Sequence, residues 1–330
     1  MLASICTKYG PPDVLEVKQI EKPIPEDQEI LIQIHASTVN RTDCAILRAK
    51  PFIMRFFTGL FRPKRTVSGT DFAGSIEAVG KAVSKYKVGD RVFGFDDLGL
   101  SAHAQYMALS EDKALTHIPE NVSYAQAAAS SEGVHYAYNI VNKVRIESGQ
   151  TILVNGATGA IGSAAVQMLK YLGANVVAVC RAEHAALVTS LGADRIIDYV
   201  NEDFTKEQQQ YDFVFDTVGK SSFFKCKPVL KPGGVYISSE LGWMAQNLFF
   251  ALITPLTGKF SRHGRKKVIF PVPTDIKASL RFVKELMEKG KFKAVIDRQY
   301  PLAQIADAYR YVETGQKTGN VVIDMVSSPS

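Results

Sequence analysis

The residues most clearly suited to chemistry are three glycines in the segment Thr151-Ile-Leu-Val-Asn-Gly-Ala-Thr-Gly-Ala-Ile-Gly162. An apolar run precedes them and an amphipathic stretch follows, which predicts a strand, a tight turn and a helix. Such a turn brings backbone N–H groups and the positive end of a helix to a phosphate. A side chain at Gly159 would block the phosphate, and one at Gly162 would push the helix off the strand. We therefore predict a dinucleotide site at Ala157, Thr158, Gly159, Ala160, Ile161 and Gly162.

Arg181 gives this site a preference between cofactors. The strict G-x-G-x-x-G pattern lacks its first glycine, since Ala157 stands there, so the turn alone is a weak motif. Arg181 ends the next apolar run, where an acid would hold the ribose 2′-hydroxyl of NAD. Guanidinium binds a 2′-phosphate that a carboxylate would repel, which favours NADPH, although the nearby Glu183 leaves use of NADH open. Tyr199, after the third run, is a further candidate for the adenosine-phosphate edge; for it and Arg181 the alternative is a solvated strand end.

Composition indicates a soluble globular protein large enough for two domains. The chain has 330 residues, of which 46% are hydrophobic and 22% charged. Its net charge of +6 is spread along the chain, which argues against a nucleic-acid partner. The 4 cysteines form no C-x-x-C pair, so we expect a reducing cytoplasm, with neither a disulfide framework nor a structural zinc site. The most apolar window, Leu241 to Thr257, is too short for an integral membrane segment and is expected to be buried or to face a subunit.

Two local patterns divide the chain. Residues 1–121 contain short β-type runs between glycines and prolines, which predicts a β-barrel. Residues 122–271 alternate strands with helices, which predicts an α/β domain with a doubly wound parallel sheet. The last strand, 320–325, is expected to return to the barrel, so residues 272–330 join the first domain. The strands predicted for the inserted domain are 151–155, 175–180, 194–198, 212–218, 234–239 and 267–271.

Short motifs run in one order from end to end of the chain. They include Asn40-x-x-Asp43, Gly69-x-Asp71-x-x-Gly74, Val88-Gly-Asp-Arg-Val92, the glycine turn, Lys231-Pro-Gly-Gly234 and Thr318-Gly-Asn-Val-Val-Ile323. Together they resemble the medium-chain dehydrogenase/reductase superfamily, in its zinc-independent quinone oxidoreductase-like branch. The resemblance implies a GroES-like β-barrel domain, an inserted Rossmann domain and a cofactor in the cleft between them. It also implies that Gly219 lies near the adenosine and ribose, that Asn320 approaches the phosphates, and that the chain forms a homodimer, with strand 234–239 a candidate subunit edge.

Two positions of this chain depart from the zinc-dependent members of the superfamily. Zinc alcohol dehydrogenases bind their catalytic metal with a Cys and a His, where this sequence has Asn40 and Thr70. An amide and a hydroxyl are poor zinc ligands, so no metal site is expected. Cys44 and His103 lie nearby in sequence and are expected to be packed barrel residues, not a metal pair.

Without a Lewis acid, the easiest reaction is hydride transfer to an acceptor that delocalises its own charge. The catalytic candidates are Asn40, Thr70 and Asp71, with Asn40 the best donor to a developing enolate or hydroquinone oxygen. Their alternative role is structural, with Asn40 satisfying backbone groups and Asp71 capping or pairing. Some relatives take the proton from a tyrosine in the following loop, but residues 41–66 contain none, which leaves the proton donor unassigned.

The apolar segment 51–61, with phenylalanines at 52, 56, 57 and 61, has two interpretations. It is either a mobile lid over a small hydrophobic or quinonoid substrate, or ordinary core. The leading prediction for the whole chain is an NADPH-dependent, zinc-independent reductase of quinones or α,β-unsaturated carbonyls. The alternatives are an enoyl-thioester or other carbonyl or alcohol oxidoreductase of the same fold, and an NADPH-binding structural or interaction protein without turnover.

Overall fold

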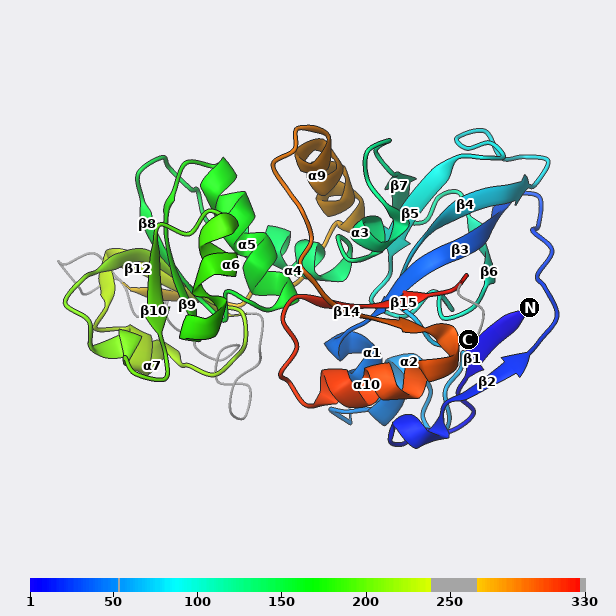
Figure 1. Ribbon diagram of the computed structural model, residues 1–330, viewed down its shortest axis with the longest axis horizontal. Helices are drawn as coiled ribbons and strands as arrows, with labels where there is room; N and C mark the ends of the chain where they lie inside the picture. The colour runs from blue at the N-terminus through cyan, green and yellow to red at the C-terminus, as the bar shows by residue number, and fades with distance from the viewer. Residues whose placement is uncertain (53, 239–265, 327–330) are drawn as a thin grey trace. The chain divides into compact units, whose positions relative to one another are not determined.

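The computed structural model describes residues 1–52, 54–238 and 266–326. The chain divides into two compact units (Figure 1). The first, which we call the barrel unit, contains Met1–Glu132 and Asp275–Ser330, and the second, the parallel-sheet unit, contains Gly133–Thr274. The apolar window Leu241 to Thr257 lies outside the described residues. In the described ranges, no helix is both long and apolar enough to span a bilayer.

The barrel unit is built on a sheet in the order β14-β15-β3-β4-β5-β7, with β6 also paired to β3. Its strands are β3 (Glu29–Val39), β4 (Asp71–Val79), β5 (Arg91–Phe95), β6 (Tyr106–Ser110), β7 (Leu115–His117), β14 (Ile296–Pro301) and β15 (Asn320–Asp324). A separate pair is formed by β1 (Leu2–Ile5) and β2 (Glu16–Gln19). The predicted return of the C-terminal strand is confirmed, because β15 runs antiparallel to β3 with Val321 opposite Val39.

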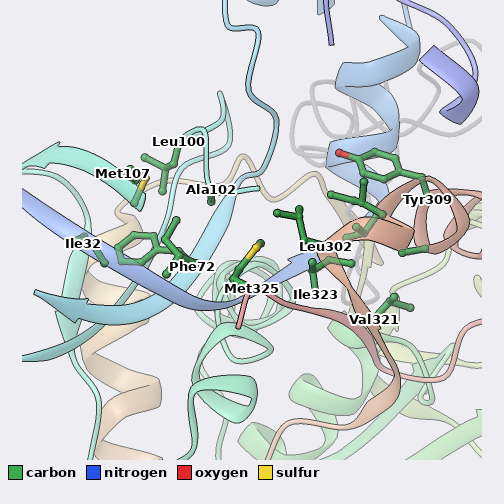
Figure 2. Close-up of a cluster of buried hydrophobic side chains, with 14 of the residues drawn as sticks. Ile32, Phe72, Leu100, Ala102, Met107, Leu302, Tyr309, Val321, Ile323 and Met325 are labelled. Carbon is green, nitrogen blue, oxygen red and sulfur yellow. The ribbon is translucent and has the colours of Figure 1, made fainter. Parts of the chain in front are cut away.

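The core of the barrel unit joins residues from both of its chain segments. Figure 2 shows Ile32 and Phe72 of the N-terminal strands in one cluster with Val321 and Ile323 of β15. Tyr309, on helix α10, is fully buried in the same cluster. The helices of the unit are α1 (Arg41–Arg48), α2 (Met54–Thr58), α3 (Tyr124–Ala128), α9 (Ile276–Glu288) and α10 (Ile305–Glu313). Burial of side chains from both segments explains why the second segment belongs to this unit.

The units divide after Glu132 and after Thr274, whereas the sequence placed the boundaries after 121 and 271. The difference has a packing reason. Helix α3 contacts strands β3 and β4, so the helical segment that follows residue 122 belongs to the barrel unit. The sequence pattern therefore changes from strand to helix before the boundary between the two units is reached.

The parallel-sheet unit has the strand order β10-β9-β8-β11-β12-β13, with every pair parallel. The six predicted strands are all present, as β8 (Thr151–Asn155), β9 (Asn175–Cys180), β10 (Arg195–Asp198), β11 (Tyr211–Asp216), β12 (Leu230–Ser238) and β13 (Lys267–Ile269). This order, 3-2-1-4-5-6 in sequence, is that of the Rossmann fold. The helices are α4 (Glu132–Val141), α5 (Ala160–Tyr171), α6 (Ala185–Ser190) and α7 (Phe223–Cys226).

Strand 234–239, expected as a candidate subunit edge, lies inside the described sheet. Strand β12 pairs with β11 on one side and with β13 on the other, so its backbone groups are engaged in both directions. Within the described sheet, the edge strands are β13 and β10.

Helix α5 approaches the turn after β8 at glycine backbone. A Cβ at Gly162 would lie 2.1 Å from the carbonyl oxygen of Gly156 and 2.9 Å from the Cα of Ala157. These are backbone atoms, which cannot rotate away as a side chain can. The predicted reason for glycine at this position, close approach of helix and strand, is therefore present in the structure.

His103 is buried in the barrel unit with both ring nitrogens engaged. Nε2 lies 2.9 Å from the Thr38 carbonyl oxygen, and Nδ1 lies 3.0 Å from Ser68 Oγ and 3.4 Å from Tyr309 Oη. Burial lowers the pKa of His103 from its ordinary value of 6.5 to about 4. The imidazole is therefore neutral in the folded protein at neutral pH.

Replacing Gly162 by alanine is expected to lower the free energy of unfolding by about 1–3 kcal/mol, because the new methyl group would displace backbone. The same substitution at Gly159 is the matched control, since a Cβ there would meet only the Gly156 carbonyl oxygen, at 3.7 Å. Urea unfolding measures both. Equal stability of the two variants would show that α5 does not depend on this contact.

His103 should make stability fall with pH in the acid range. Between pH 6.5 and about 4 the unfolded chain binds a proton at this imidazole that the folded chain does not, so unfolding is favoured as the pH falls. Compared with His103→Gln, the wild type is expected to lose up to about 3 kcal/mol of unfolding free energy across that window. Urea titrations at several pH values measure the difference. A difference that stays constant with pH would contradict a neutral buried imidazole.

Candidate functional site

The glycine turn leaves space in front of helix α5. Gly156 has φ +84°, a left-handed conformation that favours glycine, and it turns the chain away from β8. Gly159 is the N-cap of α5 with φ −70° and makes no side-chain cap hydrogen bond. Since a Cβ at Gly159 would meet only one atom, at 3.7 Å, neither packing nor backbone conformation requires glycine here. The space that its missing side chain leaves lies before the free N–H groups of the first helical turn, which fits a pyrophosphate.

The six predicted turn residues divide by burial. Ala157, Ala160 and Gly162 are buried, so they serve the packing of the turn against the sheet. Thr158, Gly159 and Ile161 are half-buried and present the surface of the turn. The structure therefore places these three, with the backbone N–H groups of the turn, where a ligand can reach them.

Arg181 and Tyr199 come together at the neighbouring strand ends. Strands β9 and β10 are parallel, with Cys180 opposite Asp198, so the next residue of each strand stands at the same edge. Arg181 Nε donates a hydrogen bond to Tyr199 Oη at 2.9 Å, and Arg181 Nη1 lies 3.7 Å from Glu183 Oε1. The Arg181 side chain is exposed. This pair is able to bind a phosphate through charge-assisted hydrogen bonds.

A cavity of about 330 Å³ opens beside Tyr199 and is lined by residues 199–204. Two of its lining residues, Glu202 and Asp203, are acidic. Carboxylates repel phosphate, so this cavity does not itself suit the 2′-phosphate. Arg181, which is cationic, is the residue suited to bind the 2′-phosphate.

Asp216 positions a loop of the candidate site, a role that the sequence did not predict. Its fully buried carboxylate accepts hydrogen bonds from Asn155 Nδ2 at 3.0 Å, Tyr236 Oη at 2.9 Å and the backbone N–H groups of Gly219 and Ser221 at 3.0 and 3.1 Å. It therefore fixes the loop that holds Gly219, whose φ is +65°. The sequence feature that could have indicated this role is an acidic residue, Asp216, at the end of an apolar strand and three residues before Gly219.

Asn40 and Thr70, predicted as catalytic residues, lie together in the barrel unit. Asn40 Nδ2 donates to Thr70 Oγ1 at 3.2 Å and to Thr38 Oγ1 at 3.4 Å. Asn40 also begins helix α1 with a capping box, in which its side chain accepts from Asp43 N at 3.1 Å and Asp43 Oδ2 accepts from Asn40 N at 3.0 Å. Both residues are buried. The amide therefore has the structural role given above as the alternative.

Asp71 ties strand β4 to strand β3. Its carboxylate accepts from Thr38 N at 2.8 Å, from Thr38 Oγ1 at 2.6 Å and from Ser37 Oγ at 3.4 Å. Burial raises the pKa of Asp71 to about 6, and these hydrogen bonds oppose the shift. The Asp71 carboxylate is thus paired with Ser37 and Thr38, which is the structural role given as its alternative. Through Thr38 it also fixes one of the two hydroxyls that Asn40 contacts.

Glu132 is a buried acid that the sequence did not single out. It accepts a short hydrogen bond from Thr42 Oγ1, next to the first turn of α1. Burial raises the pKa of Glu132 to about 8, although the positive charge of Lys317 opposes the shift. A carboxyl of this kind holds a proton at neutral pH and is able to act as an acid. A lone Glu within the alanine- and serine-rich segment 125–132 was its only signal in the sequence.

Asn320 is buried at the start of β15, where it serves the backbone. Its N–H and its Nδ2 both donate to the Val295 carbonyl oxygen, at 2.9 and 3.0 Å. The side chain therefore secures the junction between β14 and β15, a role that the sequence did not predict.

The side chains at and near the positions of the zinc ligands make contacts within the protein. Asn40 caps α1 and His103 has both nitrogens engaged, while burial raises the pKa of the Cys44 thiol and disfavours its thiolate. Throughout the described part of the chain, no three His, Cys, Asp or Glu side chains are grouped so that they could hold a metal ion.

The interpretation of segment 51–61 as ordinary core is wrong. Phe56 is 65% exposed and Phe61 86%, so these rings are not packed inside the barrel unit. Among the described residues of the segment, only Thr58 and Gly59 are buried. The apolar side chains lie on the surface because polar contacts hold the other side of the segment to the unit.

Two family descriptions match the chain. Residues 26–138 match the alcohol dehydrogenase GroES-like domain, and residues 191–323 match the zinc-binding dehydrogenase domain. The 2-methylene-furan-3-one reductase of Solanum lycopersicum is 32% identical over 96% of this chain and 77% of the relative. The chloroplastic NADPH-dependent alkenal/one oxidoreductase of Arabidopsis thaliana is 30% identical over 98% of this chain and 79% of the relative.

Solved structures share the fold. The quinone oxidoreductase of Coxiella burnetii superposes with a TM-score of 0.82 at 23% identity, over 98% of this chain and 99% of that one. The Escherichia coli quinone oxidoreductase, complexed with NADPH, gives 0.78 at 23% identity over 98% and 100%. From the fold of both units and the sequence identity along nearly all of its length, the chain belongs to the medium-chain dehydrogenase/reductase superfamily, in its quinone oxidoreductase-like branch.

Proposed function

We propose that this protein is an NADPH-dependent, zinc-independent oxidoreductase that reduces a quinone or an α,β-unsaturated carbonyl. The observation that carries the proposal is the open glycine turn before α5 together with the exposed Arg181 at the next strand end. The names of the relatives, a furanone reductase and an NADPH-dependent alkenal/one oxidoreductase, support the same cofactor and acceptor class.

The residues of the parallel-sheet unit would hold the cofactor at three points. The N–H groups of the first turn of α5 would bind the pyrophosphate, and Arg181 with Tyr199 would bind the 2′-phosphate. The loop fixed by Asp216 would place Gly219 beside the ribose. When bound, NADPH supplies the hydride.

The residues of the barrel unit would serve the acceptor. Asn40 and Thr70 form a buried pair of hydrogen-bonding groups, positioned by the α1 capping box and by Asp71 through Thr38. Such a preorganised pair is able to stabilise negative charge on an oxygen. The reduced acceptor also needs a proton, and Glu132, which holds one at neutral pH, is the residue we propose as its source.

We also propose that the protein is a homodimer that acts in the cytoplasm. The 4 cysteines, all free and buried, suit a reducing compartment. The relatives include proteins named as chloroplastic and others named as mitochondrial, which makes a direct localisation experiment necessary.

Arg181→Ala is expected to weaken NADPH binding by roughly ten- to a hundred-fold and to change NADH binding little, because only NADPH carries the 2′-phosphate. Titration calorimetry with each cofactor measures both constants. Arg145→Ala is the matched control, since the Arg145 side chain is 89% exposed elsewhere in the same unit. Equal losses of NADPH and NADH binding would show that Arg181 does not recognise the 2′-phosphate.

Turnover is expected with NADPH and a simple quinone or enone, at a rate that a chelator leaves unchanged.

Asn40→Ala should lower kcat by about ten-fold or more if its amide orients or stabilises the acceptor. Glu132→Gln should lower kcat for the enone and change its pH dependence near pH 8. Loss of NADPH absorbance measures these rates. Stoichiometric zinc in the active protein would overturn the metal-free chemistry, and NADPH binding without turnover of quinones, enones or acyl thioesters would indicate a binding protein.

A further inference from the structure

The segment 51–65 exposes a group of large apolar side chains. Five of them, which we call the aromatic patch, are between 46% and 86% exposed: Phe52, Phe56, Phe57, Leu60 and Phe61. Single exposed apolar residues are common, but a group within ten consecutive residues marks a surface that binds another phase or molecule. The Phe52 and Phe56 rings lie edge to face, 6.0 Å apart, so these two members of the patch pack against each other.

Contacts on the inner side of the segment hold the patch outward. Tyr9 Oη lies 2.8 Å from Thr58 Oγ1 and donates to the Gly59 carbonyl oxygen at 2.7 Å. The Lys64 N–H donates to the Thr58 carbonyl oxygen at 2.8 Å. Gly59 has φ +129°, and a Cβ there would lie 2.0 Å from the Arg62 carbonyl oxygen. Polar contacts thus hold the inner side of the segment, while its apolar side chains are exposed on the outer side.

Cationic residues flank the patch along the sequence, and of these Arg48 is ion-paired with Glu313. From residue 44 to residue 70 the sequence contains no acidic residue. In the same stretch it has six cationic residues, Arg48, Lys50, Arg55, Arg62, Lys64 and Arg65. Arg62, Lys64 and Arg65 are exposed and directly follow the patch. Arg55 donates to the Leu60 carbonyl oxygen at 3.1 Å and lies over the Tyr9 ring.

We propose that segment 51–65 docks the protein on the surface of a bilayer that contains anionic phospholipid. The aromatic patch would enter the headgroup region, and Arg62, Lys64 and Arg65 would meet lipid phosphates, a combination of apolar and cationic groups typical of peripheral membrane binding. A second copy of the chain fits less well, since patch-to-patch contact would bring two sets of cations together. The proposal concerns a surface outside the proposed cofactor and catalytic residues and does not depend on the proposed function.

Vesicle sedimentation with the full-length protein tests the proposal. The wild type is expected to bind vesicles of phosphatidylcholine with about one quarter phosphatidylglycerol, to bind pure phosphatidylcholine much less, and to dissociate as salt is raised. Phe57→Ser with Phe61→Ser should reduce partition to the anionic vesicles by at least about ten-fold. Replacing Arg62, Lys64 and Arg65 by glutamine should reduce it by on the order of a hundred-fold, since each charge near such a surface contributes about five-fold.

Two matched controls keep the result specific. Phe224→Ser removes a phenylalanine that is 60% exposed in the other unit, and the triple variant Lys81→Gln, Lys87→Gln, Lys143→Gln removes three exposed charges elsewhere. Both should bind vesicles as the wild type does. Absence of binding by the wild type, or equal losses in the patch and control variants, would overturn the proposal. Concentration-dependent self-association that the patch variants abolish, without vesicle binding, would instead identify a second copy as the occupant.

Discussion

The candidate cofactor site depends on the backbone contact between helix α5 and the turn that precedes it. Gly162 allows the helix to start against the Gly156 carbonyl group, where a single methyl group would not fit. This contact sets the helix N-terminus at the carboxyl edge of the sheet, beside the loop that Asp216 holds. Glycine at 159 has the opposite role, because it leaves space that the protein itself does not fill. The same turn therefore combines a packing requirement with an open binding surface.

The barrel unit uses polar groups in a comparable way. Buried Asp71, Thr38, Asn40 and Thr70 form one hydrogen-bonded network in which nearly every group has a protein partner. A network with this degree of order is expensive to rearrange, because a broken bond would leave a buried polar atom unpaired. Structural and catalytic roles are thus compatible for Asn40, since the contacts that cap α1 also fix the direction of its amide.

Much of this could be predicted from the sequence because it depends on local pattern. Apolar runs located the six strands of the parallel sheet, and glycine spacing located the turn and its close contact. The errors concern long-range contacts. The boundary after Glu132 depends on the packing of α3 against β3 and β4, and the exposure of Phe61 depends on how Tyr9 holds a segment fifty residues away. The roles of Asp216 and Glu132 were missed because their partners, Tyr236 and Thr42, come together only in the fold.

The docking segment and the barrel-side network belong to one stretch of chain. Asn40 begins α1, Thr70 precedes β4, and their 3.2 Å hydrogen bond closes the base of the loop that contains segment 51–65. Quinones and enones with hydrocarbon tails partition into bilayers, so a loop that binds lipid at its tip and ends at these residues would connect a lipid-phase substrate to the barrel unit. This proposed connection would account for exposed phenylalanines, which lower the solubility of a free protein, in this loop of the unit.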